Sequence, residues 1–457
     1  MQVTQGEGMQ IAKLSVAAAI VLGLSGSVYA ADTLADAFKN GKVSGELKAW
    51  YWDQTADFRA GDKPGNVNIF NTAIELGYVT DSFYGLRMGV TFQGNATPFA
   101  DADAKTAYKY EEWASGSTLS EAYLGYKIGK TDIKIGRQYI NTPLIAGNYA
   151  RIFKESFQGV SIVNNDLPDT TVFAHYINKT QGRTSAVMGN EAGDAPTFEK
   201  RALFAGVVNA AGVAFDGAYG LGAINKSITN LTLTGQYVRA MDAALKTSII
   251  NPLASDDVDL YYTEMNYTYP MNGFKLGFDA NFRGSKTGSN LDVLNAEGHM
   301  LGGRIRVSEL NGFGASFAAT TNSKKDDVIA SIGLGGDAYT SVMIRGPFNT
   351  TPLANSDAYK LEVSYDFSKM NIPGLTFIGQ YQWTDQGKMA VTTGTSAIGT
   401  SADFTTYAAN LTYAVPYVKG LTTQLLYVTQ EKEATSASNV VTKTDTDELW
   451  FKANYKF

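Results

Sequence analysis

The chain has 457 residues with 38 basic and 44 acidic side chains, which give a net charge of −6, and it has no cysteine. The two charge signs are interspersed, which argues against a nucleic-acid-binding protein because such proteins carry a clustered basic face. The absence of cysteine excludes disulfides as the source of stability, and the high content of Gly (46), Tyr (26) and Phe (23) favours many strands with aromatic girdles.

The N-terminal segment, residues 1–30, predicts a secretory signal peptide. Lys13 supplies a positive charge, an apolar run follows at 14–24, and small residues precede the expected cleavage after Ala30. The apolar run is shorter than the ~20 residues that a membrane-spanning helix needs. The residues before Met9 fit this pattern poorly, so we expect the true start at Met9. Residues 31–457 would then form one exported domain.

Beyond residue 31 the dominant sequence pattern has a period of two. Residues 274–282 place Phe, Leu and Ala at even positions and Lys, Gly, Asp and Asn at odd positions, and similar alternation occurs at 86–93 and 359–367. Neighbouring residues of a strand point to opposite faces of the sheet. An apolar face and a charged face on many strands of an exported chain indicate a barrel with lipid outside and water inside.

The predicted fold is therefore an all-β, closed antiparallel transmembrane β-barrel of about 18 strands. Short turns rich in Gly, Pro, Asn and Asp alternate with long loops, as in outer-membrane barrels. The pattern is weakest across 159–227, so sixteen strands remain an alternative. The predicted strands lie near 42–53, 66–79, 85–96, 118–129, 132–140, 159–166, 170–179, 201–210, 228–239, 257–269, 274–284, 299–308, 312–322, 357–368, 375–386, 403–415, 421–432 and 447–457.

The C-terminus carries an independent signal. Phe451, Tyr455 and Phe457 share one face of the last predicted strand, and the chain ends on this aromatic residue. The ending resembles the assembly signal of bacterial outer-membrane barrels, which implies the barrel assembly machinery as a partner. We expect the first strand, Val43–Trp52, to pair with the last, because closure leaves no unpaired backbone groups in hydrocarbon.

One segment resembles a known family. The stretch from Ile135-Gly136-Arg137-Gln138-Tyr139-Ile140-Asn141-Thr142-Pro143-Leu144-Ile145-Ala146-Gly147-Asn148 through Arg151 to Phe157-Gln158-Gly159-Val160 is similar to the OprD-type outer-membrane porin family. Residues 38–52 also resemble the N-terminal segment of mature members of that family. The resemblance implies channels for small, often carboxylated solutes, including amino acids, lined by a ladder of basic residues. It also implies that the loop after residue 140 folds into the pore. The related major outer membrane porins, which are broad-range trimers, remain an alternative.

Several charged side chains fall on the face opposite the apolar one. Rows of opposite charge in a pore select solutes by sign and size, although charges in a polar lumen also simply satisfy one another. We expect Asp279 to neutralise Arg283, which leaves Arg304 and Arg306 as the main attraction for anions. Alternation places Arg137 outward, an unusual position for a charge. The predicted channel-lining residues are Arg87, Lys127, Lys134, Arg283, Arg304, Arg306, Glu121 and Asp279.

The loop 141–158 combines charged and apolar residues. Arg151, Lys154 and Glu155 stand beside several large aliphatic and aromatic side chains. We expect the apolar residues to pack the loop against the barrel wall and the charged ones to form a constriction. The other interpretation is an ordinary loop that covers the rim or forms a subunit contact.

Enzymatic chemistry has little support in the sequence. His175 and His299 have no context that marks a Ser/His/Asp centre, and no metal motif is present, so we expect no catalytic residue, metal or cofactor. Acidic pairs in outer loops, such as Asp326-Asp327, are interpreted as solvated charge, with calcium binding as an alternative.

The sequence thus predicts a porin of the Gram-negative outer membrane for passive diffusion of small hydrophilic solutes, with a preference for anions. The expected partners are outer-membrane lipid, the solutes, the assembly machinery and, for a trimeric porin, copies of the chain. The alternatives are a non-selective trimeric porin, an outer-membrane hydrolase, and a plugged structural or adhesive barrel.

Overall fold

The computed structural model describes residues 31–56, 65–206, 212–244, 254–343 and 353–457. The predicted signal peptide and the start at Met9 lie outside the described residues. Among the described helices, none is long and apolar enough to cross a membrane. A short helix, α2 (Leu34–Lys39), precedes the first strand, and the Thr33 side chain caps it by accepting from the Asp36 N–H.

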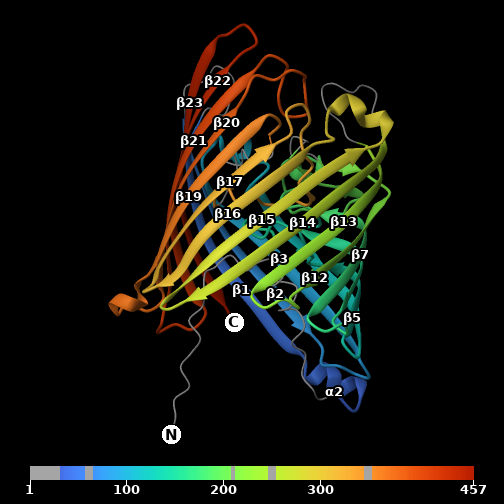
Figure 1. Cartoon of the computed structure of the whole chain (residues 1–457). Coiled ribbons are helices and arrows are strands. Elements are labelled where there is room, and N and C mark those ends of the chain that lie inside the picture. The colour runs from blue at the N-terminus through green and yellow to red at the C-terminus, as the bar shows by residue number, and fades with distance from the viewer. Residues whose placement is uncertain (1–30, 57–64, 207–211, 245–253, 344–352) are drawn as a thin grey trace.

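Eighteen of the described strands form a single antiparallel barrel (Figure 1). The first strand pairs with the last over ten residue pairs from Glu46↔Lys456 to Thr55↔Asp447, which closes the wall. The eighteen wall strands are β1 (Lys42–Ala56), β2 (Gly65–Val79), β3 (Leu86–Ala100), β4 (Ala114–Ile128), β5 (Thr131–Gln138), β6 (Ser156–Asn164), β7 (Thr170–Gln181), β12 (Gly217–Asn225), β13 (Leu231–Ala243), β14 (Asp256–Met271), β15 (Phe274–Thr287), β16 (His299–Leu310), β17 (Phe313–Asn322), β19 (Ser356–Asp366), β20 (Leu375–Gln386), β21 (Ser401–Ala414), β22 (Leu421–Thr435) and β23 (Val441–Lys456).

The prediction of a closed barrel with eighteen strands is confirmed, and seventeen of the predicted strands overlap wall strands. The strand predicted at 201–210 is wrong. Its described residues form two short strands inside the barrel, β9 (Arg201–Ala202) and β10 (Phe204–Ala205), and the eighth wall strand is β12. The inward residues of β12 are glycine and apolar rather than charged, so the alternation that marks the other strands is absent there.

The outward face of the wall is apolar and aromatic. Phe278, Ile305 and Phe317 lie on neighbouring strands and are exposed. Further round the barrel, Tyr359 and Trp383 stack with ring centroids 5.1 Å apart. Such a band of exposed aliphatic residues with aromatic side chains matches the hydrocarbon layer of a membrane and its interface.

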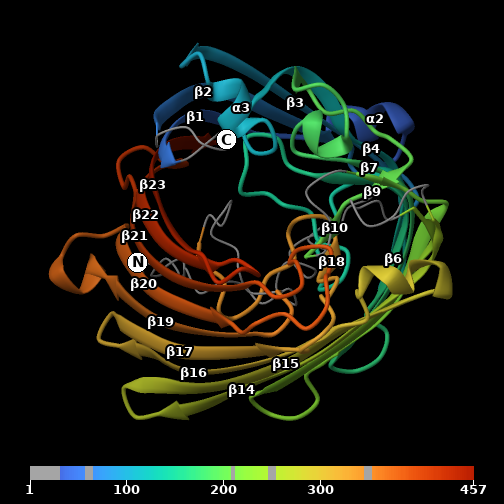
Figure 2. The ribbon, with the colours of Figure 1, turned by 90° about the horizontal axis from the view of Figure 1, so that it is seen from above.

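Four long connections at one end of the barrel matter for the lumen. We call them L2 (101–113), L3 (139–155), L4 (182–216) and L7 (323–355). L4 contributes β10 and L7 contributes β18 (Ser331–Ile332), which pair with each other. Figure 2 shows β10 and β18 inside the ring of wall strands. The described parts of L4 and L7 therefore occupy the lumen rather than extending away from it.

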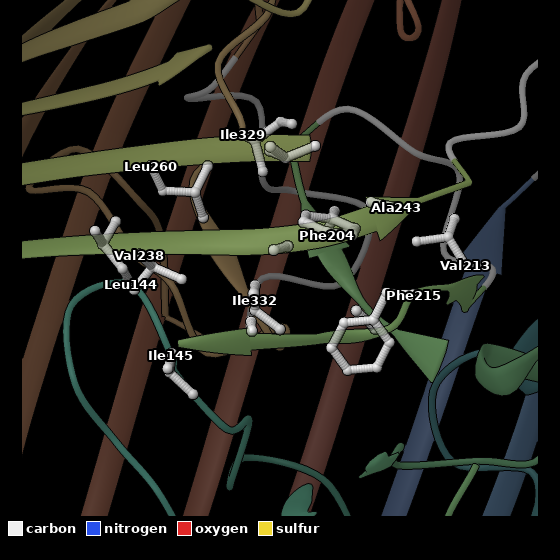
Figure 3. Close-up of a cluster of buried hydrophobic side chains, with 14 of the residues drawn as sticks. Leu144, Ile145, Phe204, Val213, Phe215, Val238, Ala243, Leu260, Ile329 and Ile332 are labelled. Atoms are coloured by element: carbon white, nitrogen blue, oxygen red, sulfur yellow. The ribbon is translucent and has the colours of Figure 1, made fainter. Parts of the chain in front are cut away.

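An apolar core holds these loops inside the barrel (Figure 3). Leu144 and Ile145 of L3, Phe204 of L4 and Ile332 of L7 pack with inward residues of β12, β13 and β14 such as Leu260. Burying an aliphatic side chain contributes roughly 1.5–3 kcal/mol. The loops are thus fixed parts of the structure, and one sector of the inner wall is apolar because it binds loops instead of water.

Candidate functional site

L3 crosses the lumen and is anchored on two different walls. At its start, the Leu144 N–H donates to Gln236 Oε1 of β13 at 2.9 Å, and Gln236 Nε2 donates to Thr142 Oγ1 at 2.9 Å. At its far end, Lys48 Nζ of β1 donates to the Ile152 carbonyl at 3.0 Å. The position of L3 inside the barrel therefore depends on both walls.

L7 runs beside L3 and is bonded to it. The Ala146 N–H donates to the Ile332 carbonyl at 2.8 Å, and the Ile332 N–H donates to the Leu144 carbonyl at 2.9 Å. The Glu155 carboxylate, only 1% exposed, accepts from the Asn148 and Leu334 N–H groups, each at 2.9 Å. Among the three charged residues predicted in L3, Glu155 is thus placed at the junction between the two loops.

Arg151, the second of these residues, is buried at the tip of L3. Its guanidinium contacts Glu111 of L2 at 2.7 Å and lies 4.0 Å from Glu112, whose side chain accepts from the Ile152 N–H at 3.1 Å. Burial raises the pKa of the Glu112 carboxyl to about 7, against the opposing effect of the Arg151 charge. Arg151 therefore joins L3 to L2.

Lys154 is the third and keeps access to the lumen. Its Nζ lies 2.7 Å from Glu75 and 3.5 Å from Glu46, on β2 and β1, and its side chain is 21% exposed. Lys154 therefore lies between carboxylates of two neighbouring wall strands, and the buried Lys48 of β1 also interacts electrostatically with both carboxylates. The sequence placed Lys154 in the constriction loop but did not indicate its partners.

A second charged group lies on β14, β15 and β16. Asp279 is fully buried and accepts from Arg304 at 2.8 Å and from Arg306 at 3.0 Å, while those two side chains are 22% and 28% exposed. The expected pair between Asp279 and Arg283 is not formed. Arg283 is buried and donates instead to the carbonyls of Pro143, Ala330 and Asp337, because L3 and L7 fold onto this wall.

The remaining predicted lining residues lie on β3, β4 and β5. Arg87 Nη2 donates to both carboxylate oxygens of Asp132, at 2.6 and 2.7 Å. The Lys134 ammonium lies 4.7 Å from the centre of the Tyr123 ring, and Glu121 accepts from the Thr91 hydroxyl at 2.7 Å. Lys127 is exposed beyond them, near the short turns.

Sequence reasoning missed several residues that organise the lumen. Tyr339 of L7 donates to Glu264 at 2.6 Å, and its ring lies 4.5 Å from the Arg304 guanidinium. Alternation within β1 and β23 places Lys48 and Lys452 inward, but only the folded loops reveal what they bind. The Tyr339 and Glu112 contacts depend on loop conformation, for which the sequence offered no pattern.

Arg137, His175 and Asp327 have partners that the sequence did not indicate. Arg137 stacks on Phe198 of L4 at 4.4 Å, which explains how a charge is accommodated outside the lumen row. His175 is buried against Ser161 at 2.9 Å. The expectation that Asp327 is solvated is wrong. Its side chain is buried and accepts from the Ala354 and Thr395 N–H groups at 3.0 and 3.1 Å. Within the described residues, no cluster of metal-binding side chains is found.

Several solved structures from Pseudomonas share the fold of this chain. OpdQ of Pseudomonas aeruginosa matches with a TM-score of 0.68 and 16% identity over 92% of this chain and 99% of that chain. A BenF-like porin of Pseudomonas fluorescens Pf-5 matches with a TM-score of 0.71 and 12% identity over 92% and 100%. OpdK of Pseudomonas aeruginosa, solved with vanillate, matches with a TM-score of 0.67 and 13% identity over 92% and 99%.

A comparison with curated protein sequences finds no match. The model of a protein family described as outer membrane porin, OprD family, matches residues 100–457. This match covers most of the chain and agrees with the barrel, the inward loops and the charged lumen. The chain therefore belongs to the OprD family of outer membrane porins and is a channel for small solutes in the Gram-negative outer membrane, not an enzyme.

Proposed function

We propose that this channel prefers small anionic solutes, carboxylates first. The observation that carries the proposal is the group on β14–β16, where two partly exposed guanidinium groups share the single buried carboxylate of Asp279. With Glu264 and the buried Arg283 included, this part of the wall holds three positive charges and two negative ones. A local excess of positive charge raises the concentration of anions, and guanidinium binds a carboxylate with two parallel hydrogen bonds.

The comparison with OpdK supports the choice of solute class. That protein was solved with vanillate, which carries a carboxylate. A carboxylate is the charged group that vanillate and the proposed solutes of this channel share.

The experiment is a reversal-potential measurement in a salt gradient. The variant Arg304→Gln/Arg306→Gln removes both charges and retains donors toward Asp279. We expect it to lower chloride preference, most clearly at low ionic strength, where screening is weak. The matched control is Lys275→Gln on β15, since Lys275 forms an exposed pair with Glu309 at 2.7 Å. An equal reversal potential in wild type and the double variant would refute the role of this group.

We also propose that L3, held by L2 and L7, is the constriction of the pore, with Lys154 as its lumen-facing charge. Its support is the double anchorage of L3 to β13 and β1. A small channel-blocking cation offers a direct test. If Lys154, Glu46 and Glu75 line the narrow part, Lys154→Gln will increase block by the cation, because both carboxylates lose the ammonium group that lies within 4 Å of them.

We also propose a role for Phe457 in barrel assembly. The terminal Phe457 exchanges backbone hydrogen bonds with Gly45, at 3.0 and 3.1 Å. This position at the closing seam supports its role as a signal for the barrel assembly machinery. A homotrimer remains a prediction from the sequence, and cross-linking in intact outer membranes tests it.

A further inference from the structure

The tip of L3 lies on the seam where the barrel closes. β1 and β23 pair here with Trp50 opposite Lys452 and Trp52 opposite Trp450. Lys452 Nζ donates to the Ala150 carbonyl at 3.2 Å. Lys48 Nζ, from the other strand of the seam, donates to the Ile152 carbonyl at 3.0 Å. The Ala150 and Ile152 carbonyls of L3 thus accept hydrogen bonds from two ammonium groups that lie near opposite ends of the chain.

Aromatic side chains enclose this contact. The Lys452 ammonium lies 3.7 Å from the Trp50 ring centre and 4.6 Å from that of Trp450, and Trp450 stacks on Trp52 at 3.7 Å. Both lysines are buried. A buried ammonium needs oxygen partners because burial removes its water. The L3 carbonyls supply oxygen atoms at the point where the indole rings exclude solvent.

Arg151 adds a further contact at the L3 tip. Its guanidinium contacts Glu111 of L2 at 2.7 Å, lies 5.3 Å from the Trp450 ring centre, and donates from Nη1 to the Ala150 carbonyl at 3.5 Å. The L3 backbone at 150–152 is therefore held between the seam and L2. The Ile152 side chain packs in the apolar cluster that includes Trp50.

We propose that Lys48 and Lys452 are positioning residues that clamp the L3 tip to the closed seam, so that L3 docks only after β1 has paired with β23. The consequence for transport rests on the proposed role of L3 as the constriction. In an unclosed barrel the two lysines would not lie side by side, and the L3 tip would lack one of its two ammonium contacts. Closure of the wall and narrowing of the pore would then be one coupled event.

The first test measures exposure of the L3 tip without measuring transport. Ile152 is 2% exposed, and the native chain has no cysteine, so Ile152→Cys gives a single buried thiol. In this background, Lys48→Met and Lys452→Met keep an apolar side chain of similar length and remove the donor. We expect thiol reactivity with a water-soluble maleimide to rise roughly tenfold or more, as for loss of a charge-assisted hydrogen bond.

The matched control is Lys432→Met on β22, next to β23. The described contact of its ammonium is with the Phe404 ring at 5.5 Å, away from L3. All variants are first checked for heat-modifiable electrophoretic mobility, which reports a closed barrel. If the double variant Lys48→Met/Lys452→Met does not fold, the two single variants are used instead. Thiol protection that stays at the parental level in folded Lys→Met variants would overturn the clamp.

Single-channel conductance of the same variants separates the two proposals. Exposure of the thiol with a larger conductance supports both. Exposure of the thiol with unchanged conductance leaves the clamp intact and refutes the constriction role of L3.

The order of events needs a second experiment. Ala49 and Ala453 are directly paired across the seam, so Ala49→Cys/Ala453→Cys forms a disulfide once the strands have paired. During refolding, protection of the Ile152→Cys thiol is expected to coincide with or follow the ability to form this crosslink. Protection that appears before crosslinking would overturn the coupling of docking to closure.

Discussion

Glu155 in L3 accepts a hydrogen bond from the Leu334 N–H in L7 at 2.9 Å, although the two residues are 179 positions apart in the chain. The same carboxylate oxygen accepts from Asn148 within L3. One buried side chain therefore fixes the internal turn of L3 and its distance from L7. This contact makes the two loops behave as a single body across the lumen.

The first prediction concerns this contact. Glu155→Ala removes the acceptor of the buried Asn148 N–H, at a cost of about 1–3 kcal/mol, and of the partly buried Leu334 N–H. We expect L3 and L7 to separate locally and the open-channel current to become noisier while the barrel stays folded. Glu155→Gln keeps one acceptor oxygen, so its open-channel current noise should be close to that of the wild type. Equal noise in wild type and Glu155→Ala would contradict a supporting role for Glu155.

The second prediction concerns pH and Glu112. Burial raises the pKa of this carboxyl to about 7 from 4.5, so the folded loops bind the proton more tightly than the unfolded chain does. Stabilisation from the protonated form is complete at low pH and is lost as pH rises from about 4.5 through 7. Hydrogen exchange at 150–155, corrected for intrinsic rates, should therefore increase over this range. In Glu112→Gln the increase should be absent, and its persistence would assign the effect to another group.

The third prediction concerns the C-terminus. Deleting Phe457 removes both hydrogen bonds to Gly45 and the terminal aromatic ring. We expect much less folded barrel in the outer membrane, with normal conductance in the molecules that do insert. Phe457→Tyr, which keeps the ring, is the matched control. Wild-type amounts of heat-modifiable barrel in the deletion strain would argue against an assembly role.

The fourth prediction concerns export. The apolar run and small residues before residue 31 predict cleavage after Ala30. Intact-mass measurement of the protein from outer membranes should give residues 31–457. A mass that includes residues 1–30 would show that the segment is retained.

Most of the wall was predictable because each strand of a barrel separates lipid from water. That constraint produces the alternation of Phe278 and Asp279 that the sequence displays. It fails at β12, where Ala218 and Ile224 face other apolar residues inside the barrel. The strand predicted at 201–210 was wrong for the same reason, since apolar loop residues packed in the lumen resemble wall residues.

The site was predictable only in part. Alternation gave the face of Arg283, Arg304 and Arg306 but not their partners, which depend on strand register and on the loops. Asp279 lies directly opposite Arg304 in the register of β15 and β16. Arg283 is buried and binds loop carbonyls. Contacts between L3 and L7 join distant segments of irregular backbone, and no local pattern encodes them.

The most direct measurement is the current carried by purified residues 31–457 in a planar bilayer with a potassium chloride gradient at low ionic strength. An open, anion-preferring channel predicts discrete current steps and a reversal potential displaced toward the chloride equilibrium potential. Absence of steps would contradict an open pore. A reversal potential displaced toward the potassium equilibrium potential would contradict the anion preference assigned to Arg304 and Arg306.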